Sequence, residues 1–211
     1  MKHVSSVFAF ACCIAAAPAW AQDSAKIAQG GAGNSAMIEQ IATAGNNMAR
    51  VHQGEGWQSG SGNHAQLMQR AVDSSRIDVM QSGFNNQYSV HQYDGSNLQA
   101  NVNTNSGMYG QQGGEGNSIQ ISQSGSNAMA WVEQGGSMNS RVDIWQSGWD
   151  GQKMADVWQS GSSNQAMVNQ HGGSSQASVH QAGSNLNASI TQGSNGYGYG
   201  HGNTAHIRQG F

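Results

Sequence analysis

A short phrase recurs along most of the chain and constrains its fold more than any other feature. It consists of a small or β-branched residue, a spacer, Ile, Val or Leu, another spacer, and Gln, as in Ala36-x-Ile38-x-Gln40 and Ala166-x-Val168-x-Gln170. Fifteen copies are present, and fourteen of them end in Gln while one ends in Thr104. Self-similarity of this kind predicts a repetitive architecture in which each unit packs against its neighbours.

Within each copy the apolar positions lie two residues apart, which is the period of a β-strand and not of a helix. The charged residues support this interpretation, because those within the copies lie one or three residues before the final Gln, on the opposite face. They are Lys26, Glu39, Arg50, Asp78, Glu133, Asp143, Asp156 and Arg208. The pattern therefore predicts strands with one apolar and one solvent-facing side.

Most copies follow one another at intervals of eleven to thirteen residues, which fit a short strand and a turn. The phrase Gln-Ser-Gly at 81–83, 123–125, 146–148 and 159–161 predicts turns, since Gly supplies the positive φ that turns require. Two strands and two turns would form one coil. The sequence thus predicts an all-β, two-sided parallel β-solenoid of about seven coils over residues 22–211, with longer loops at 54–62, 105–116 and 193–202.

The final Gln of each copy lies two residues after the Ile, Val or Leu that is expected to be buried, so both side chains lie on the same side of the strand. The Gln amide is therefore expected to point inward. An isolated buried amide is costly, but identical amides stacked coil upon coil can hydrogen bond in continuous ladders, as in cross-β structures. The predicted ladder comprises Gln29, Gln40, Gln53, Gln69, Gln81, Gln92, Gln123, Gln134, Gln146, Gln159, Gln170, Gln181, Gln192 and Gln209.

The residue six positions before the Gln lies on the same, inward side of the strand and predicts a second ladder beside the turn. Its members are Asn34, Asn47, Asn63, Ser75, Asn86, Asn117, Ser140, Asn164, Ser175 and Asn203. Among the copies that depart from this pattern, four have Leu98, Ala128, Lys153 and Leu186 at the Asn/Ser position.

The first 21 residues predict a secretory signal peptide, with Lys2 and His3 before an apolar run and Ala19-Trp20-Ala21 as the processing site. Both cysteines, Cys12 and Cys13, lie inside it, so the exported chain would contain no disulfide. A lipoprotein site at Cys12 is the alternative interpretation. The remaining seven Lys/Arg against eleven Asp/Glu argue against a nucleic-acid partner.

The sequence contains no pattern that predicts catalysis or a cofactor. His52, His91 and His180 occupy the outward position before Gln in different copies. This placement indicates solvent-facing polar residues or incidental metal binding, and not a specific metal site. The carboxylates are sparse and offer no pair for acid–base chemistry. Outward Trp145 and Trp158, in consecutive copies, could form a contact patch or simply be solvent-facing strand residues.

The spacing Ser-x5-Gln followed by Asn-x5-Gln, with Gly between, resembles the curlin repeat of bacterial curli subunits. It is seen at Ser75–Gln81 with Asn86–Gln92, and the resemblance extends over the whole mature chain. This resemblance implies a secreted subunit of extracellular, pilus-like amyloid fibres that serve biofilm formation, adhesion and cell aggregation. It also implies export through the periplasm and an outer-membrane channel, periplasmic chaperones, and a partner subunit that nucleates the fibre.

The first and last copies lie close to the ends of the mature sequence, so we expect no capping coil at either end. Open ends would favour head-to-tail polymerisation of the chain with itself. Two alternatives remain at this point: a minor, nucleating subunit of the same fibre, or a monomeric secreted β-solenoid that acts as an adhesin.

Overall fold

The computed structural model describes residues 23–43, 45–54, 60–103, 114–149, 151–193 and 202–210. The predicted signal peptide and Thr104 lie outside these residues, as do most residues of the three predicted loops. Every regular element in the described part of the chain is a β-strand. That part contains no helix with the length and hydrophobicity that a membrane crossing needs.

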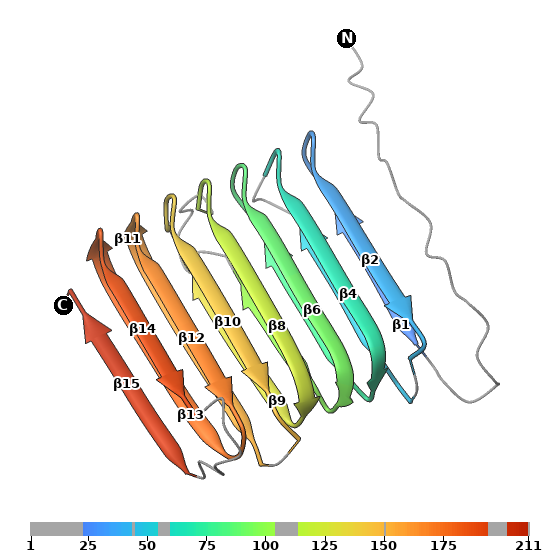
Figure 1. Ribbon diagram of the computed structural model, residues 1–211. Helices are drawn as coiled ribbons and strands as arrows, with labels where there is room; N and C mark the ends of the chain where they lie inside the picture. Colours follow the sequence, from blue (N-terminus) through green and yellow to red (C-terminus); the bar gives the residue numbers. More distant parts are fainter. Residues whose placement is uncertain are drawn as a thin grey trace.

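Alternate strands along the chain belong to two different parallel sheets (Figure 1). The eight-stranded sheet contains β1 Ser24–Gln29, β3 Met48–Gln53, β5 Arg76–Gln81, β7 Gln99–Asn103, β9 Ala128–Gln134, β11 Lys153–Ser162, β13 Ser175–Ser184 and β15 Asn203–Gln209. The seven-stranded sheet contains β2 Ser35–Ile41, β4 His64–Asp73, β6 Gln87–Ser96, β8 Ser118–Ser126, β10 Arg141–Ser147, β12 Gln165–His171 and β14 Asn187–Gln192.

Each strand pairs with the strand two places along the chain, and equivalent positions of the repeat lie side by side. Gln29 is in register with Gln53, and Gln146 with Gln170. The coils therefore stack in chain order, from β1 and β2 at one end to β14 and β15 at the other (Figure 1). The predicted two-sided parallel β-solenoid of about seven coils is confirmed.

The core between the sheets is built from the positions two and four residues before the Gln. Val51, Val79 and Val132 are fully buried at the first of these positions, and Ala49 and Ala130 are buried at the second. Ala at one position and a branched residue at the other give each coil a similar thickness, so successive coils can stack without gaps. Tyr88 is an exception, a large buried side chain where many copies have Ala.

Several strands extend farther into the corners than the sequence indicates, at both corners of the coil. The segment Gln159-Ser-Gly161 was expected to be a turn but lies within β11, where Gly161 is in register with Gly183 of β13. Likewise β8 continues through Gly125 to Ser126. Because every coil bends at the same place, adjacent backbones remain hydrogen bonded around the bend, and the true turn shrinks to a few residues.

At the corner that leads from the eight-stranded to the seven-stranded sheet, the residue before the Asn/Ser position has a positive φ. This holds for Gly33, Gly62, Asn85, Gly116, Asn139, Ser163 and Asn185. Glycine and asparagine adopt this conformation most readily. Parallel bridges at the same corner link Ser61 to Phe84, Phe84 to Glu115, and Glu115 to Met138. The last residues of the loops predicted at 54–62 and 105–116 thus belong to the regular corner.

Close approach between coils makes glycine necessary at Gly161. Its φ is +97°, and a Cβ atom there would lie 1.9 Å from the carbonyl oxygen of Gly183 in the next coil. Gly172 has a similar φ of +87°, but a Cβ atom there would meet nothing within 4 Å. Comparing the two positions separates two effects. The backbone strain of a positive φ is common to both, whereas the clash between coils arises only at Gly161.

We predict that Gly161→Ala destabilises the fold by about 2 kcal/mol more than Gly172→Ala, because only the first forces two backbones apart. Both variants carry the same strain from positive φ, so Gly172→Ala is the matched control. Urea denaturation of freshly refolded monomer at low protein concentration would measure the difference. Equal midpoints for the two variants would contradict the close stacking at this corner.

Candidate functional site: stacked amides and the ends of the solenoid

The terminal glutamines form hydrogen-bonded rows along the axis of the solenoid. In the seven-stranded sheet one row runs through all seven coils, with Nε2 of each Gln donating to Oε1 of the next over 2.8–3.0 Å. This row comprises Gln40, Gln69, Gln92, Gln123, Gln146, Gln170 and Gln192. Every bond points the same way, toward the later strands.

The eight-stranded sheet carries the same row in two pieces. Gln29 donates to Gln53 and Gln53 to Gln81, over 2.6 and 2.5 Å. A second series links Gln134, Gln159, Gln181 and Gln209 over 2.7–2.9 Å. The copy between the two pieces ends in Thr104, and among the described residues the buried Oε1 of Gln134 has no hydrogen-bond partner.

The second N–H of most of these amides reaches across the core to the other sheet. Its acceptor is the carbonyl at the start of the preceding strand, five residues before the Gln position of that strand. Gln92 donates to the carbonyl of Arg76 over 3.0 Å, and Gln146 donates to that of Met129 over 2.9 Å. The same bond is made by Gln53, Gln69, Gln81, Gln123, Gln159, Gln170, Gln181, Gln192 and Gln209.

An interior glutamine therefore accepts one bond from the coil before, donates one to the coil after, and donates one to the opposite sheet. This uses both donors of the amide and one acceptor site, so burial leaves little polar capacity unpaired. The cross-core bond was not predicted from the sequence. The sequence feature that could have predicted it is the constant spacing between the Gln and the core residues, which fixes where along the strand the side-chain amide lies.

The Asn/Ser row is linked differently from the Gln rows. At the corner leading into the seven-stranded sheet, each side-chain oxygen accepts from the backbone N–H of the equivalent residue in the next coil. Asn34 Oδ1 accepts from Asn63 N and Asn63 Oδ1 accepts from Asn86 N, each over 3.0 Å. The series continues through Asn117, Ser140 and Asn164 to the backbone N–H of Leu186.

The Nδ2 groups of the same asparagines donate to carbonyls of the turn. Asn63 donates to Gly83 over 2.9 Å, and Asn86 donates to Ser82 and Gly114 over 3.0 and 2.9 Å. Asn86 Nδ2 also donates to Asn63 Oδ1 of the preceding coil over 3.2 Å, but most bonds of this row go to the backbone of the turns. This row holds the turns, whereas the Gln rows hold the strands.

The opposite corner, which leads into the eight-stranded sheet, is less regular. Asn47 and Ser75 follow the same scheme, with Asn47 Oδ1 accepting from Ser75 N and Ser75 Oγ accepting from Leu98 N. Val72, Leu98 and Ala128 then replace polar contacts with a small apolar cluster. Farther along, the buried Ser175 Oγ has no hydrogen-bond partner within the described part of the chain, and Asn203 is partly exposed.

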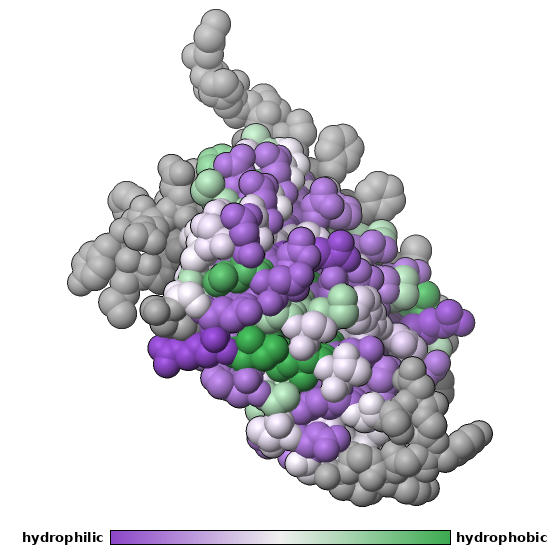
Figure 2. All heavy atoms as spheres, turned by 60° about the vertical axis from the view of Figure 1, so that its left-hand side comes forward, coloured by the Kyte–Doolittle hydropathy of each residue, from purple (hydrophilic) through white to green (hydrophobic). Residues whose placement is uncertain are grey.

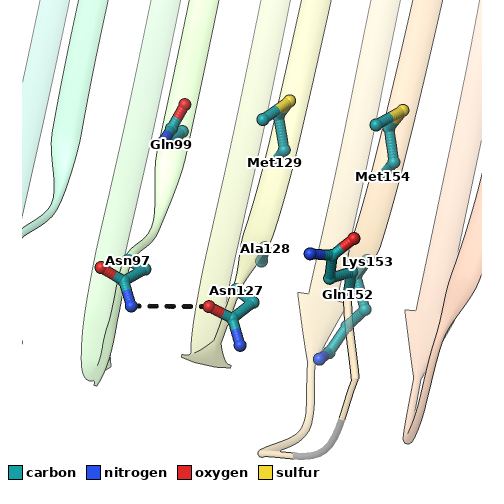
Figure 3. Close-up of a pocket in the computed structure, with 8 residues that line it drawn as sticks. All are labelled: Asn97, Gln99, Asn127, Ala128, Met129, Gln152, Lys153 and Met154. Carbon is teal, nitrogen blue, oxygen red and sulfur yellow. Dashed lines mark hydrogen bonds between the residues drawn. The ribbon is translucent and has the colours of Figure 1, made fainter.

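Lys153 occupies the same position in β11 and is almost completely buried, with 1% of its surface exposed. Its Nζ donates to the carbonyl oxygen of Ser126 over 3.2 Å. It borders a pocket of about 170 Å³ together with Asn97, Asn127 and Gln152 (Figure 3). The sequence indicated the inward position of Lys153 but not that an ammonium group would be buried there.

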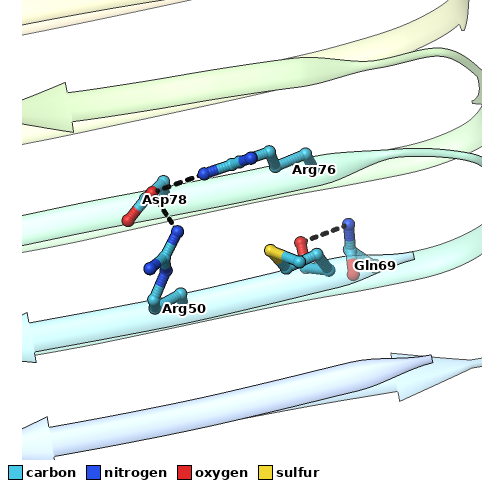
Figure 4. A network of polar contacts seen from close by, with 5 residues as sticks. Arg50, Gln69, Arg76 and Asp78 are labelled. Atoms are coloured by element: carbon cyan, nitrogen blue, oxygen red, sulfur yellow. Dashed lines mark hydrogen bonds and ion pairs between the residues drawn. The ribbon is translucent and has the colours of Figure 1, made fainter. Parts of the chain in front are cut away.

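The outer faces carry ion pairs, of which Arg50–Asp78 joins neighbouring strands while the others lie within one strand. Asp78 accepts from both Arg50 and Arg76 over 3.0 Å, and Figure 4 shows this network beside Gln69. Arg141 pairs with Asp143 over 2.7 Å. The hydrogen bond to Asp143 raises the pKa of Arg141 above its usual value, and the negative charge of Asp143 adds a smaller effect in the same direction.

The outward histidines and tryptophans do not gather as a functional centre. Within the described ranges no group of three or more His, Cys, Asp or Glu side chains is placed to hold a metal ion. The predicted patch of Trp145 and Trp158 is wrong, because β10 and β11 belong to opposite sheets and their outer sides face away from each other. Trp158 instead contacts His180, at 6.1 Å between ring centroids.

The two ends of the stack expose the edges of both sheets. Within the described residues, no strand pairs with the outer edges of β1 and β2 or of β14 and β15. Figure 2, which turns the side of β14 and β15 forward, shows an apolar area framed by polar side chains. The Gln rows reach both ends, with Oε1 of Gln29 and Gln40 as the first acceptors and Nε2 of Gln192 and Gln209 as the last donors.

These features define a parallel β-solenoid with directional amide rows, a class of protein built from identical stacked coils. The curlin associated repeat matches residues 161–193, which include β12, β13 and β14. The resemblance to curlin repeats found in the sequence is thereby confirmed for this segment. No curated protein and no solved structure matches the chain.

We predict that Gln146→Leu destabilises the fold by about 2–4 kcal/mol, because it leaves the buried partner groups of Gln123, Gln170 and Met129 unpaired. Gln120→Leu, at an exposed position of β8, is the matched control and should change stability little. Urea midpoints of the two monomeric variants provide the comparison. A neutral Gln146→Leu would show that the amide rows contribute nothing to stability.

Restoring the missing glutamine should have the opposite effect. Thr104→Gln would supply a donor for the unpaired Oε1 of Gln134, and we expect it to raise stability by about 1 kcal/mol or more. Thr104→Leu, which adds side-chain volume without an amide, is the control. If both variants stabilise equally, added apolar contact and not the hydrogen bond is responsible.

Proposed function

We propose that the chain is a secreted structural subunit that polymerises head to tail into an extracellular, curli-like amyloid fibre. In this fibre the solenoid of one copy continues into the next. Strands would lie perpendicular to the fibre axis, and the Gln ladder residues would form its core. The curlin associated repeat at residues 161–193 supports a structural and non-enzymatic role, since curlin repeats are typical of fibre subunits.

The direction of the Gln rows carries the proposal. Each amide row presents an acceptor at the β1/β2 end and a donor at the β14/β15 end. Joining opposite ends of two copies extends both rows and both parallel sheets. Joining like ends would set donor against donor or acceptor against acceptor, so the rows favour head-to-tail contact. Such a contact does not close on itself and produces filaments.

The finer features of the proposal follow from the curlin resemblance alone. They are a role in biofilm matrix, surface adhesion and cell aggregation, a route through the periplasm and an outer-membrane channel with periplasmic chaperones, and a partnership with other curli-type subunits. A minor, nucleating subunit is a variant of the same function. Adding trace amounts of this chain to a bulk curlin subunit would distinguish the two, because only a nucleator abolishes the lag of the bulk subunit.

The first test is whether the refolded mature chain forms fibres with a meridional reflection at about 4.7–4.8 Å, the spacing of strands along a cross-β axis. Its polarity can be tested with Ile207→Asp, which places a carboxylate on the inward side of β15. Such a chain can add to a fibre through its β1/β2 end but cannot be extended. Mixed at about one part in ten, it should limit fibres to on the order of ten subunits.

Thr204→Asp is the matched control, because it adds the same charge to the solvent side of the same strand. It should leave fibre length unchanged. A chain that remains a stable, soluble monomer would contradict the proposed function. Fibres that form but are shortened equally by both variants would contradict head-to-tail joining through the inward face.

A further inference from the structure

Continuing the solenoid across a junction fixes which side chains of two copies meet, and this inference rests on the proposed function. Apart from the copy that ends in Thr104, paired strands align Gln with Gln, so Gln209 of one copy would lie beside Gln29 of the next. The same register places Ile207 beside Ile27 on the inward side. On the outward side it places His206 beside Lys26.

The outer face of the eight-stranded sheet is cationic around this junction. His180 lies next to His206, with ring centroids 5.6 Å apart, and Arg208 follows on the same side of β15. On the next copy, Lys26 is in register with Arg50 of β3, where His52 also faces outward. Among the described residues of β13, β15, β1 and β3 there is no Asp or Glu.

The nearest carboxylates do not neutralise this strip. Asp78 on β5 is shared between Arg50 and Arg76, which leaves one positive charge in excess (Figure 4). Asp156 lies on β11, two strands before β15. Asp23 precedes β1, but its carboxylate accepts from Asn47 Nδ2 over 3.0 Å at the corner.

The other outer face has no such concentration of charge. Across the same junction, Ser189 and Thr191 of β14 would meet Met37 and Glu39 of β2. The charge is therefore confined to one side of the fibre. Like charges directly opposite each other on neighbouring strands oppose pairing, so assembly must overcome repulsion on this side alone.

We propose that the junction between two copies forms an anion-binding strip on the outer face of the eight-stranded sheet. Lys26 of one copy and His206 of the other lie at its centre, with His180, Arg208 and Arg50 around them. Ammonium, guanidinium and imidazole groups at the spacing of adjacent strands, about 4.8 Å, suit a multivalent oxyanion such as a chain of phosphate groups. The site is complete only in the polymer, and a bound oxyanion offsets the repulsion and speeds elongation.

Tripolyphosphate at about 1 mM is a suitable probe, because at this concentration its general salting-out effect on proteins is small. NaCl is added to keep the ionic strength the same in all samples. Wild-type fibres sedimented with the probe should carry about one tripolyphosphate per junction. Seeded elongation should be several-fold faster with the probe than without it.

The double variant Lys26→Gln, His206→Gln should bind at least about five-fold less tripolyphosphate and should elongate at a rate that the anion no longer changes. Arg70→Gln with His91→Gln, which removes the same charge from other strands, is the matched control and should behave as wild type. Equal binding by the two double variants would overturn the strip, even if both form fibres. If the wild-type chain forms no fibres, the proposed function itself is contradicted.

Discussion

The structure depends on one side chain that makes three hydrogen bonds in three directions. Most interior Gln residues of the repeat accept from the coil before, donate to the coil after, and donate across the core to the opposite sheet, as Gln146 does with Gln123, Gln170 and Met129. A buried amide without these partners would oppose folding by several kcal/mol. With them, it sets the distance between coils and the distance between sheets at once.

The rest of the coil follows from that constraint. Ala and a branched residue fill the fixed gap between the sheets, and Asn or Ser ties each turn to the next coil through its backbone. The corners can then be narrow, because the backbones pair around the bend and glycine allows them to approach, as at Gly161 and Gly183. The departures lie mainly at one corner, where Leu98, Ala128 and Lys153 replace the polar residue.

Much of this architecture could be predicted from the sequence, because its signals are periodic. The two-residue period assigns strands and faces, and the phase of the Gln relative to Ile or Val identifies the inward amides. The strands that continue around the corner through Ser160 and Gly161 could not be predicted, because local turn chemistry does not show that the next coil supplies pairing partners. The burial of Lys153 likewise depends on the depth of the corner and not on its position in the repeat.

The error over Trp145 and Trp158 has a different origin. Consecutive copies alternate between the sheets, so residues that share a face must lie two copies apart. This rule, applied to His180 and His206, does bring two outward side chains together, with 5.6 Å between their rings.

Stacking also explains why folding and polymerisation share one set of interactions. A single coil orders some two dozen residues at a cost of about 1–2 kcal/mol each and buries few large side chains, so its stability comes from the coils above and below. The contact between β13 and β15 uses the backbone pairing, apolar residues and Gln bond that a second copy would use on β15. An interface selected for folding within the chain is therefore already suited to joining copies, and specificity must come from positions that differ between coils. Lys26 and His206, on the outer face of the two terminal strands, are such positions.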